Sequence, residues 1–255
     1  MRPVFANSAT LSIPEWLVLA KGHLRTIKLG VRFGVWVHPR HGPIVIDTGY
    51  GPEVTTGRRS LALRLYAGVL RPRLETQPED VLPDLGFRAD DVKYVFVTHF
   101  HADHISGLRR FPKARFIAAG WPKIKAQPMW QRLRHGLFTE LLPDDFAERL
   151  IAIEDFPIAD LPFGRGHDLF GDASLLAIDL PGHATGHCGL VWPQHKLIYA
   201  ADAQWLGEAI AEDRPPRGPA RWVYDDEAAM TDSMALLRRA ALAGYEIVLC
   251  HDPIS

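Results

Sequence analysis

The sequence predicts an α/β fold in which short strands alternate with helices. Residues 94–97 form an apolar run typical of a strand that is buried on both faces. Several other short apolar runs end at Gly, Pro or Asp, as strands commonly do. The polar residues suited to chemistry follow such strands, which is where sites usually lie in α/β sheets. The length suits one domain, so we expect residues 1–255 to form a single domain.

The first half of the chain supplies the first strands and one helix. Apolar runs with Gly and Pro punctuation predict strands at 14–20, 33–37, 43–47 and 94–97, and a helix at 58–70. The third strand ends at a turn that begins with Asp47. After the fourth strand, a helix is expected to begin at Ile105, followed by a strand at 115–119.

The second half repeats the alternation. We expect helical segments within 121–150, strands at 175–180, 189–192, 197–201 and 246–250, a Pro-rich loop at 212–220 and a helix at 225–243. The helix begins with three acidic residues, which suit the positive end of the helix dipole, and it ends near Gly244.

Composition excludes several functional classes. The 255 residues are 47% hydrophobic and carry a net charge of −1, without the basic stripe typical of nucleic-acid binding. Cys188 and Cys250 do not form a disulfide framework, and neither a signal peptide nor a transmembrane segment is evident. We therefore expect a cytoplasmic monomer or homodimer, with neither nucleic acid nor a membrane as its partner.

One short segment is dense in metal-ligand side chains. Residues 98–104 read THFHADH and contain His99, His101, Asp103 and His104. Crowding three imidazoles around a carboxylate costs stability through desolvation and through repulsion when they are protonated. A bound metal removes both costs, and imidazole and carboxylate are ligands that catalytic zinc uses. The segment therefore predicts a metal site.

Three further candidates follow later strands. They are His183 after Pro-Gly, Asp202 and His251. Seven ligands suffice for two metal ions with open positions, whereas structural metal sites are closed, so an enzyme is favoured over a binding or sensor protein. Imidazole with carboxylate suits Zn, Fe, Mn or Co.

These motifs resemble those of a known family. The run THFHADHISG at 98–107 resembles the signature of the metallo-β-lactamase superfamily. Its remaining motifs are matched by Asp47 in IDTG, His183 in PGHATGH, Asp202 in AAD and His251. The resemblance covers most of the chain. It implies an αββα sandwich of two mixed sheets flanked by helices, with a dinuclear site between the sheets.

The resemblance also implies a role for each residue. One metal would be held by His99, His101 and His183, the other by Asp103, His104 and His251, and Asp202 would bridge them. Asp47 matches a position that orients a ligand histidine, and such partners tune metal affinity. His187 is usually not a ligand in the family. Two divalent ions are expected, with zinc first and Fe, Mn or Co as alternatives.

The ligand set narrows the choice among the branches of the superfamily. Flavodiiron proteins usually carry Glu at the position of His101, RNA-processing members add an insertion, and one subclass of β-lactamases lacks the bridging Asp. Glyoxalase II-type thioesterases add a C-terminal helical domain, for which little room follows His251. The remaining branch is the quorum-quenching N-acyl homoserine lactonase-like group, whose corresponding stretch resembles LRRFPKAR at 108–115.

This branch implies a hydrolase that opens a lactone by attack of a metal-bridging hydroxide, with Asp103 passing a proton to the leaving oxygen. A glyoxalase II-like thioesterase or another ester hydrolase remains an alternative, as does a persulfide dioxygenase-like iron enzyme. The partner would be a small lactone or ester. One departure is Trp205, because the group commonly has Tyr at that position; we expect Trp205 in the substrate pocket. Further residues in regions that flank the site in the family, for most of which core packing is the favoured role, are Trp121, Met129, Trp130, Phe138, Trp222 and Tyr224. Strand alternation places Cys250 and His251 on opposite faces.

Overall fold

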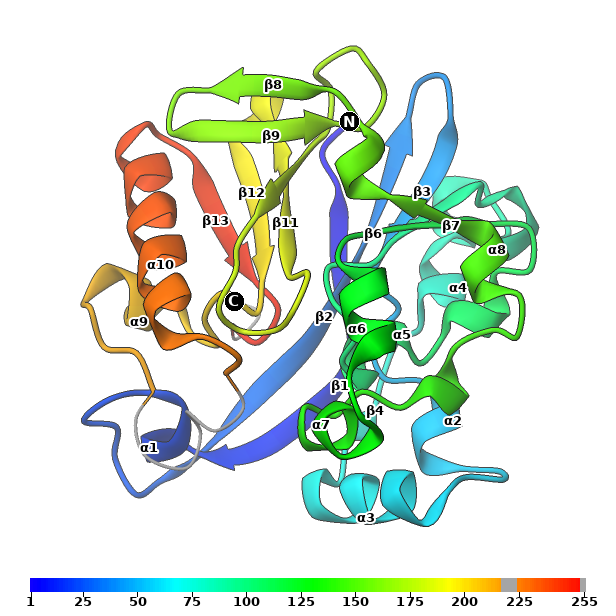
Figure 1. The fold of residues 1–255 in the computed structure, drawn as a ribbon, viewed down its shortest axis with the longest axis vertical. Coiled ribbons are helices and arrows are strands. Elements are labelled where there is room, and N and C mark those ends of the chain that lie inside the picture. The colour runs from blue at the N-terminus through cyan, green and yellow to red at the C-terminus, as the bar shows by residue number, and fades with distance from the viewer. Residues whose placement is uncertain (217–223, 253–255) are drawn as a thin grey trace. The chain divides into compact units, whose positions relative to one another are not determined.

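The computed structural model describes residues 1–216 and 224–252, so Trp222 lies outside the described residues. The chain divides into two units (Figure 1). Unit 1 comprises residues 1–11, 30–118 and 126–151, and unit 2 comprises 12–29, 119–125 and 152–255. A single domain over residues 1–255 stays a prediction.

Unit 1 is built on a seven-stranded mixed sheet in the order β4-β1-β2-β3-β5-β6-β7. Its strands are β1 (Val4–Pro14), β2 (Thr26–His38), β3 (Gly42–Ile46), β4 (Arg73–Leu74), β5 (Tyr94–Phe96), β6 (Arg115–Ala118) and β7 (Leu150–Ala152). Strands β2 and β3 form an antiparallel hairpin, whereas β3, β5 and β6 are parallel.

The parallel strands bring two polar segments to one edge of this sheet. Ile46 at the end of β3 pairs with Phe96 at the end of β5. Val45 and Val95, one position earlier, are fully buried, as expected for central parallel strands. The segments that follow the two strands, beginning at Asp47 and Val97, therefore start side by side.

Short helices connect these strands. They are α2 (Pro52–Thr55), α3 (Leu61–Leu70), α4 (Pro78–Val81), α5 (Ala102–Ile105), α7 (Met129–Arg134) and α8 (Phe146–Arg149), with 3-10 turns at 83–85, 89–91, 108–110 and 139–141. The helix predicted at 58–70 is confirmed as α3, which begins after Ser60, whose hydroxyl accepts from the Leu63 N–H. The helix predicted to begin at Ile105 instead ends there, because the chain turns helical directly after the extended His101.

Unit 2 contains a six-stranded mixed sheet in the order β13-β12-β11-β10-β9-β8. The strands are β8 (Ile158–Leu161), β9 (Gly164–Asp168), β10 (Leu176–Asp179), β11 (Cys188–Trp192), β12 (Leu197–Ala201) and β13 (Glu246–Leu249). Only the β12–β13 pair is parallel among these described strands. The helices are α1 (Glu15–Val18), α6 (Trp121–Ala126), α9 (Gly207–Ala211) and α10 (Glu227–Leu242).

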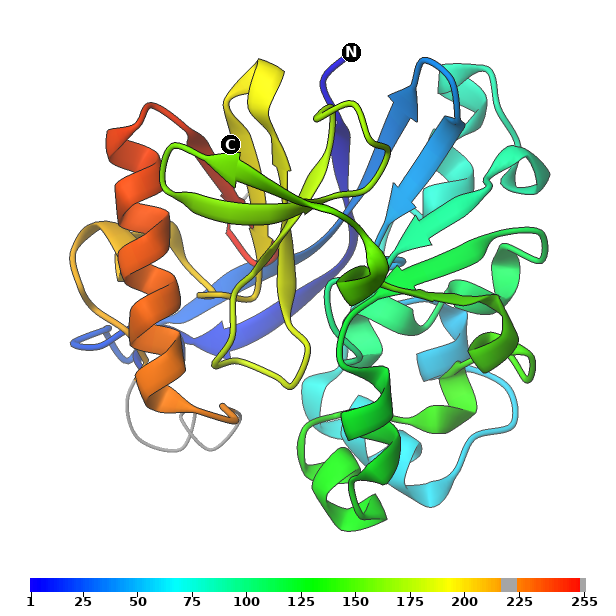
Figure 2. The ribbon, with the colours of Figure 1, turned by 45° about the horizontal axis from the view of Figure 1, so that its top comes forward.

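Helix α10 covers the sheet of unit 2 (Figure 2). Its Leu237 packs in one apolar cluster with Ile178 and Ile198 of the sheet. Asp226 caps the helix by accepting from the Ala229 N–H, so the predicted acidic N-terminus is confirmed. The α/β class with two mixed sheets and flanking helices is confirmed as well.

One predicted strand is wrong. Residues 14–20 contain helix α1, because the Leu19 N–H closes a turn on the Glu15 carbonyl at 3.0 Å. The Glu15 carboxylate also pairs with Arg25, with 2.7 Å between Oε1 and Nη2. A helical turn with a paired acidic residue is therefore found in place of the expected strand.

Candidate metal centre

Four of the predicted ligands, His99, His101, Asp103 and His104, come together in unit 1, and we call them the first half-site. They lie on the loop after β5 and on α5, and all four are buried. The rings of His99 and His104 are 4.0 Å apart between centroids, and those of His99 and His101 are 4.4 Å apart. Packed so closely, these side chains can offer several donors to one metal ion.

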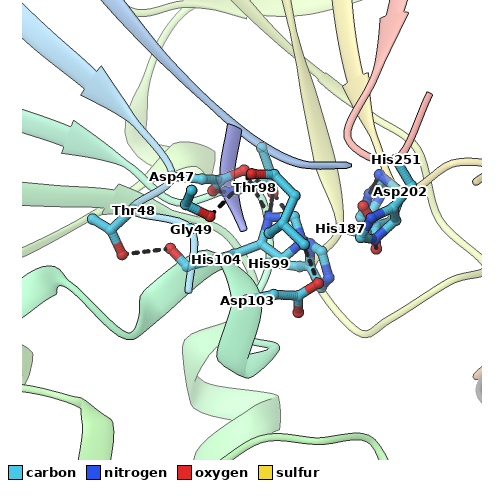
Figure 3. Close-up of polar contacts among 12 residues, drawn as sticks. Asp47, Thr48, Gly49, Thr98, His99, Asp103, His104, His187, Asp202 and His251 are labelled. Atoms are coloured by element: carbon cyan, nitrogen blue, oxygen red, sulfur yellow. Dashed lines mark hydrogen bonds and ion pairs between the residues drawn. The ribbon is translucent and has the colours of Figure 1, made fainter. Parts of the chain in front are cut away.

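A buried carboxylate fixes the orientation of His104 (Figure 3). Asp47 Oδ2 lies 2.8 Å from His104 Nδ1. Thr98 completes the network, donating from its N–H to Asp47 Oδ1 and from its hydroxyl to Asp47 Oδ2, both at 2.9 Å. With Nδ1 engaged, Nε2 lies on the side of Asp103, 3.7 Å from its Oδ2. A carboxylate behind an imidazole in this way raises its basicity as a ligand.

The backbone at Asp47 is held in the left-handed region, with φ of 54°. A non-glycine residue there costs roughly 1–3 kcal/mol, so the surroundings must hold it. The Asp47 N–H donates to the Phe96 carbonyl and the Thr48 N–H to the His104 carbonyl, both at 2.8 Å. The strained turn is thus tied to both β5 and α5, and it keeps the carboxylate against His104.

The other three predicted ligands come together in unit 2, where His183, Asp202 and His251 form the second half-site. Asp202 Oδ2 lies 3.2 Å from His251 Nε2 and 3.5 Å from His183 Nε2. All three side chains are buried. One carboxylate oxygen therefore faces two imidazoles, as a shared ligand would.

Irregular backbone geometry sets the direction of the Asp202 side chain. Ala201 has a φ of 45°, and the pairing of β12 with β13 shifts register between Tyr199 and Ala201. Such a bulge redirects the side chain that follows it. His187 anchors the same point, because its Nε2 accepts from the Asp202 N–H at 3.2 Å while its Nδ1 lies 2.8 Å from the Leu180 carbonyl. Both ring nitrogens of His187 are thus engaged in positioning.

The loop that carries His183 requires glycine at position 182. Gly182 has a φ of +123°, and a Cβ there would lie 2.3 Å from the Met230 backbone nitrogen. The Asp225 N–H donates to the Gly182 carbonyl at 2.9 Å. The start of α10 is therefore packed directly on this loop, which fixes the position of His183.

Cys250 lies closer to the second half-site than predicted. Donor atoms of Cys250, Asp202 and His251 all lie within 4.8 Å of one another. The prediction of opposite faces is wrong, because β13 ends at Leu249 and the chain bends at the next residues. Burial lowers the pKa of His251, but the charges and hydrogen bonds of Cys250 and Asp202 outweigh it, so the pKa is raised well above its ordinary value. A metal that binds His251 must displace that proton.

Two residues that sequence analysis passed over or gave little weight have clear places. Thr98 belongs to the Asp47 network, and its position directly before His99 could have indicated this role. Tyr224 packs beside His183, with 6.0 Å between ring centroids, and 5.9 Å from the ring of the half-buried Trp205. No local pattern around Tyr224 indicates this contact.

Comparison with known proteins gives a family match over most of the chain. The sequence profile of the metallo-beta-lactamase superfamily matches residues 31–251, a range that contains both half-sites. A relative from Rhizobium johnstonii, named N-acyl homoserine lactonase AttM, is 32% identical over 249 residues, covering 91% of this chain and 86% of the relative.

Solved structures share the fold. One is an N-acyl homoserine lactone hydrolase with the product N-hexanoyl-L-homoserine bound at its catalytic metal centre; its TM-score is 0.71 at 18% identity, over 98% of this chain and 92% of the other. Another is AidC, described as a dizinc quorum-quenching lactonase, with a TM-score of 0.65 at 18% identity, over 98% and 87% of the two chains.

Proposed function

The chain belongs to the metallo-β-lactamase superfamily and is a metal-dependent hydrolase, and we propose that it opens lactones, with N-acyl homoserine lactones as the first substrates to test. The observation that carries this proposal is the similarity to a relative named as such a lactonase over 91% of the chain. The donor set of the two half-sites supports it.

The two half-sites suit divalent transition metals. Each combines buried imidazoles with at least one buried carboxylate, a donor set that fits Zn, Fe, Mn or Co. We propose two ions, with zinc as the first candidate. One would be held by His99, His101 and His183, the other by Asp103, His104 and His251, with Asp202 shared between them. When bound, such a pair supplies a water nucleophile of lowered pKa and stabilises charge on the attacked oxygen.

The protein's own residues would orient the ligand histidine and protonate the leaving oxygen of the substrate. Asp47 and Thr98 hold the His104 ring through the network described above. Asp103 lies at the edge of the first half-site, and its side chain is 10% exposed. There its carboxylate could take up the proton that the attacking oxygen loses and pass it to the alkoxide that leaves when the lactone ring opens. General acid assistance of this kind is typically worth about 10²–10⁴-fold in rate.

Trp205 is proposed to line the substrate pocket. Its ring packs against Tyr224, which in turn lies beside His183. An indole N–H can donate a hydrogen bond but cannot accept one. Trp205 would therefore donate to the substrate carbonyl, a task that the lactonase-like group commonly gives to Tyr.

The proposal includes a cytoplasmic location and a small-molecule partner. Both cysteines, Cys188 and Cys250, are buried thiols outside any disulfide. Burial raises the pKa of Cys188 well above its ordinary value, and the nearby Asp179 raises it further, so this thiol stays protonated and unreactive. Thiols of this kind suit a reducing compartment.

A substrate panel tests the proposed function. Zinc-reconstituted protein is assayed with lactones, thioesters, phosphodiesters and β-lactams, and kcat/KM is compared among them. Lactones are expected to give the highest value, by at least about tenfold. A thioester or phosphodiester with the highest value contradicts the proposal. Asp202→Ala and the exposed control Asp160→Ala are assayed in parallel, so that a contaminating hydrolase is recognised.

A further inference from the structure

Helix α3 (Leu61–Leu70) carries apolar side chains on both of its faces. Leu63 and Ala67 point inward and are buried in unit 1. Leu61, Leu65 and Val69 are 69%, 63% and 80% exposed. Because these three lie four residues apart, they form one continuous stripe along the outside of the helix. A helix that faces only water normally has polar residues there.

A neighbouring helix carries two more exposed apolar side chains. Met129 and Trp130 at the start of α7 are 68% and 66% exposed. Figures 1 and 2 both show α7 beside α3 in unit 1. The Tyr66 ring of α3 lies 5.0 Å from the ring of Phe138, four residues beyond the end of α7. We call Leu61, Leu65, Val69, Met129 and Trp130 the apolar docking surface.

The chain around this surface is strongly basic. Residues 58–73 contain five arginines and residues 126–136 contain two, and neither range contains Asp or Glu, although the whole chain has a net charge of −1. Arg58, Arg64 and Arg73 form no ion pair with any described residue. Glu140 is an acid close to the helix, where it accepts from the Ser60 N–H at 2.9 Å. The segments that carry the exposed apolar side chains are therefore rich in arginine.

We propose that α3 and α7 dock the protein on the surface of an anionic lipid bilayer. Exposed Leu, Val, Met and Trp side chains would enter the boundary between headgroups and acyl chains, while the arginines reach the lipid phosphates. Trp favours this boundary because one part of its ring system is apolar and its N–H is polar. None of the helices in residues 1–216 and 224–252 is long and apolar enough to span a membrane, so the contact is peripheral.

Charge favours a bilayer over a second copy of the chain. A symmetric dimer through this surface would bring the arginine clusters of two chains against each other, and like charges across an interface cost binding energy. An anionic surface instead neutralises them. This inference is independent of the proposed lactonase activity. It departs from the expectation that no membrane is a partner, and that expectation stays a prediction until the two are tested against each other.

Vesicle binding tests the inference. The full-length protein is sedimented with vesicles of phosphatidylcholine alone and of phosphatidylcholine with phosphatidylglycerol, at low and high salt. We expect binding to the anionic vesicles that weakens with salt. The triple variant Arg58→Gln/Arg64→Gln/Arg73→Gln should bind about 100-fold more weakly, since each basic residue near an anionic surface contributes roughly a factor of five.

The apolar side chains are tested separately. Leu61→Ser/Leu65→Ser/Val69→Ser should reduce the partition coefficient at least about tenfold. The control Leu24→Ser/Ile158→Ser/Leu242→Ser removes three other exposed aliphatic side chains, and it should bind as the unchanged protein does. Circular dichroism and Tm verify that both variants fold.

Three results would overturn the inference. The first is no binding to anionic vesicles at low salt, or equal binding to neutral ones. The second is equal loss of binding in the α3 variant and its control. The third, seen by analytical ultracentrifugation, is a dimer that the α3 substitutions dissociate, because the surface would then be covered by a second copy.

Discussion

The two half-sites hold similar donors by different means. In the first half-site, four donors fall within six residues, and other side chains orient them. Asp47 and Thr98 hold the His104 ring through hydrogen bonds. In the second half-site, three donors come from segments distant in the sequence. The backbone sets the direction of their side chains, through the bulge before Asp202 and the glycine before His183. A compact motif thus needs side-chain partners to select a ring orientation, whereas dispersed ligands need accurate strand register.

The largest effect is expected at Asp202, the one carboxylate of the second half-site. Asp202→Ala should lower kcat/KM for lactones by several orders of magnitude and reduce the metal content, because the residue faces both His183 and His251. Enzyme assays with elemental analysis give both quantities, and Asp160→Ala is the exposed control. Near-normal turnover in Asp202→Ala would show that this carboxylate is not a ligand of the proposed metal centre.

Asp103 in the first half-site is expected to combine ligation with proton transfer. In Asp103→Asn, kcat for alkyl lactones should fall by about 10²–10⁴-fold, more than the metal content falls. Esters with acidic leaving groups need no proton and should lose less. Steady-state kinetics on both substrate classes provide the measurement. An equal loss on both, at full metal occupancy, assigns Asp103 to ligation or orientation alone.

Asp47 tests the claim that side chains orient the first half-site. Asp47→Asn should weaken metal binding by about 10–100-fold, because the amide is a poorer acceptor from His104 Nδ1. Competition with a chromophoric chelator measures the affinity. Thr98→Val removes only the hydroxyl bonds and should give a smaller loss. If Asp47→Asn binds metal as tightly as the unchanged protein, the orienting role is wrong.

The smallest effect is expected at Trp205. Trp205→Phe removes the indole N–H and should lower kcat/KM for lactones several-fold, whereas Trp205→Tyr keeps a donor and should recover most of the activity. Trp130→Phe, on the exposed surface of α7, is the matched control and should change nothing with a soluble substrate. Equal activities in Trp205→Phe and Trp205→Tyr place Trp205 outside the substrate contacts.

The parts of the molecule that have local sequence patterns could be predicted. The buried strand at 94–97, helix α3 and the acidic start of α10 each follow from composition and periodicity. The first half-site follows from a contiguous motif. The ligands of the second half-site were assigned by family resemblance, because nothing between positions 183 and 251 indicates their proximity on its own.

What the sequence could not predict depends on tertiary contacts. Helix α1 lies where a strand was expected, and its Glu15 carboxylate pairs with Arg25, ten residues away, a contact that no local pattern indicates. Cys250 joins the donors of the second half-site because β13 ends one residue earlier than the apolar run suggests. The contact of Tyr224 with His183 depends on the packing of α10 against the loop at Gly182.

The metal requirement of lactone hydrolysis tests the central claim most directly. Apoprotein is titrated with zinc while bound metal per chain and lactone turnover are both recorded. The proposed centre predicts binding of two ions per chain, with full turnover only when the second is bound. Full lactone turnover at one ion per chain would contradict it, as would a preparation that is active only with one iron and consumes oxygen with a persulfide.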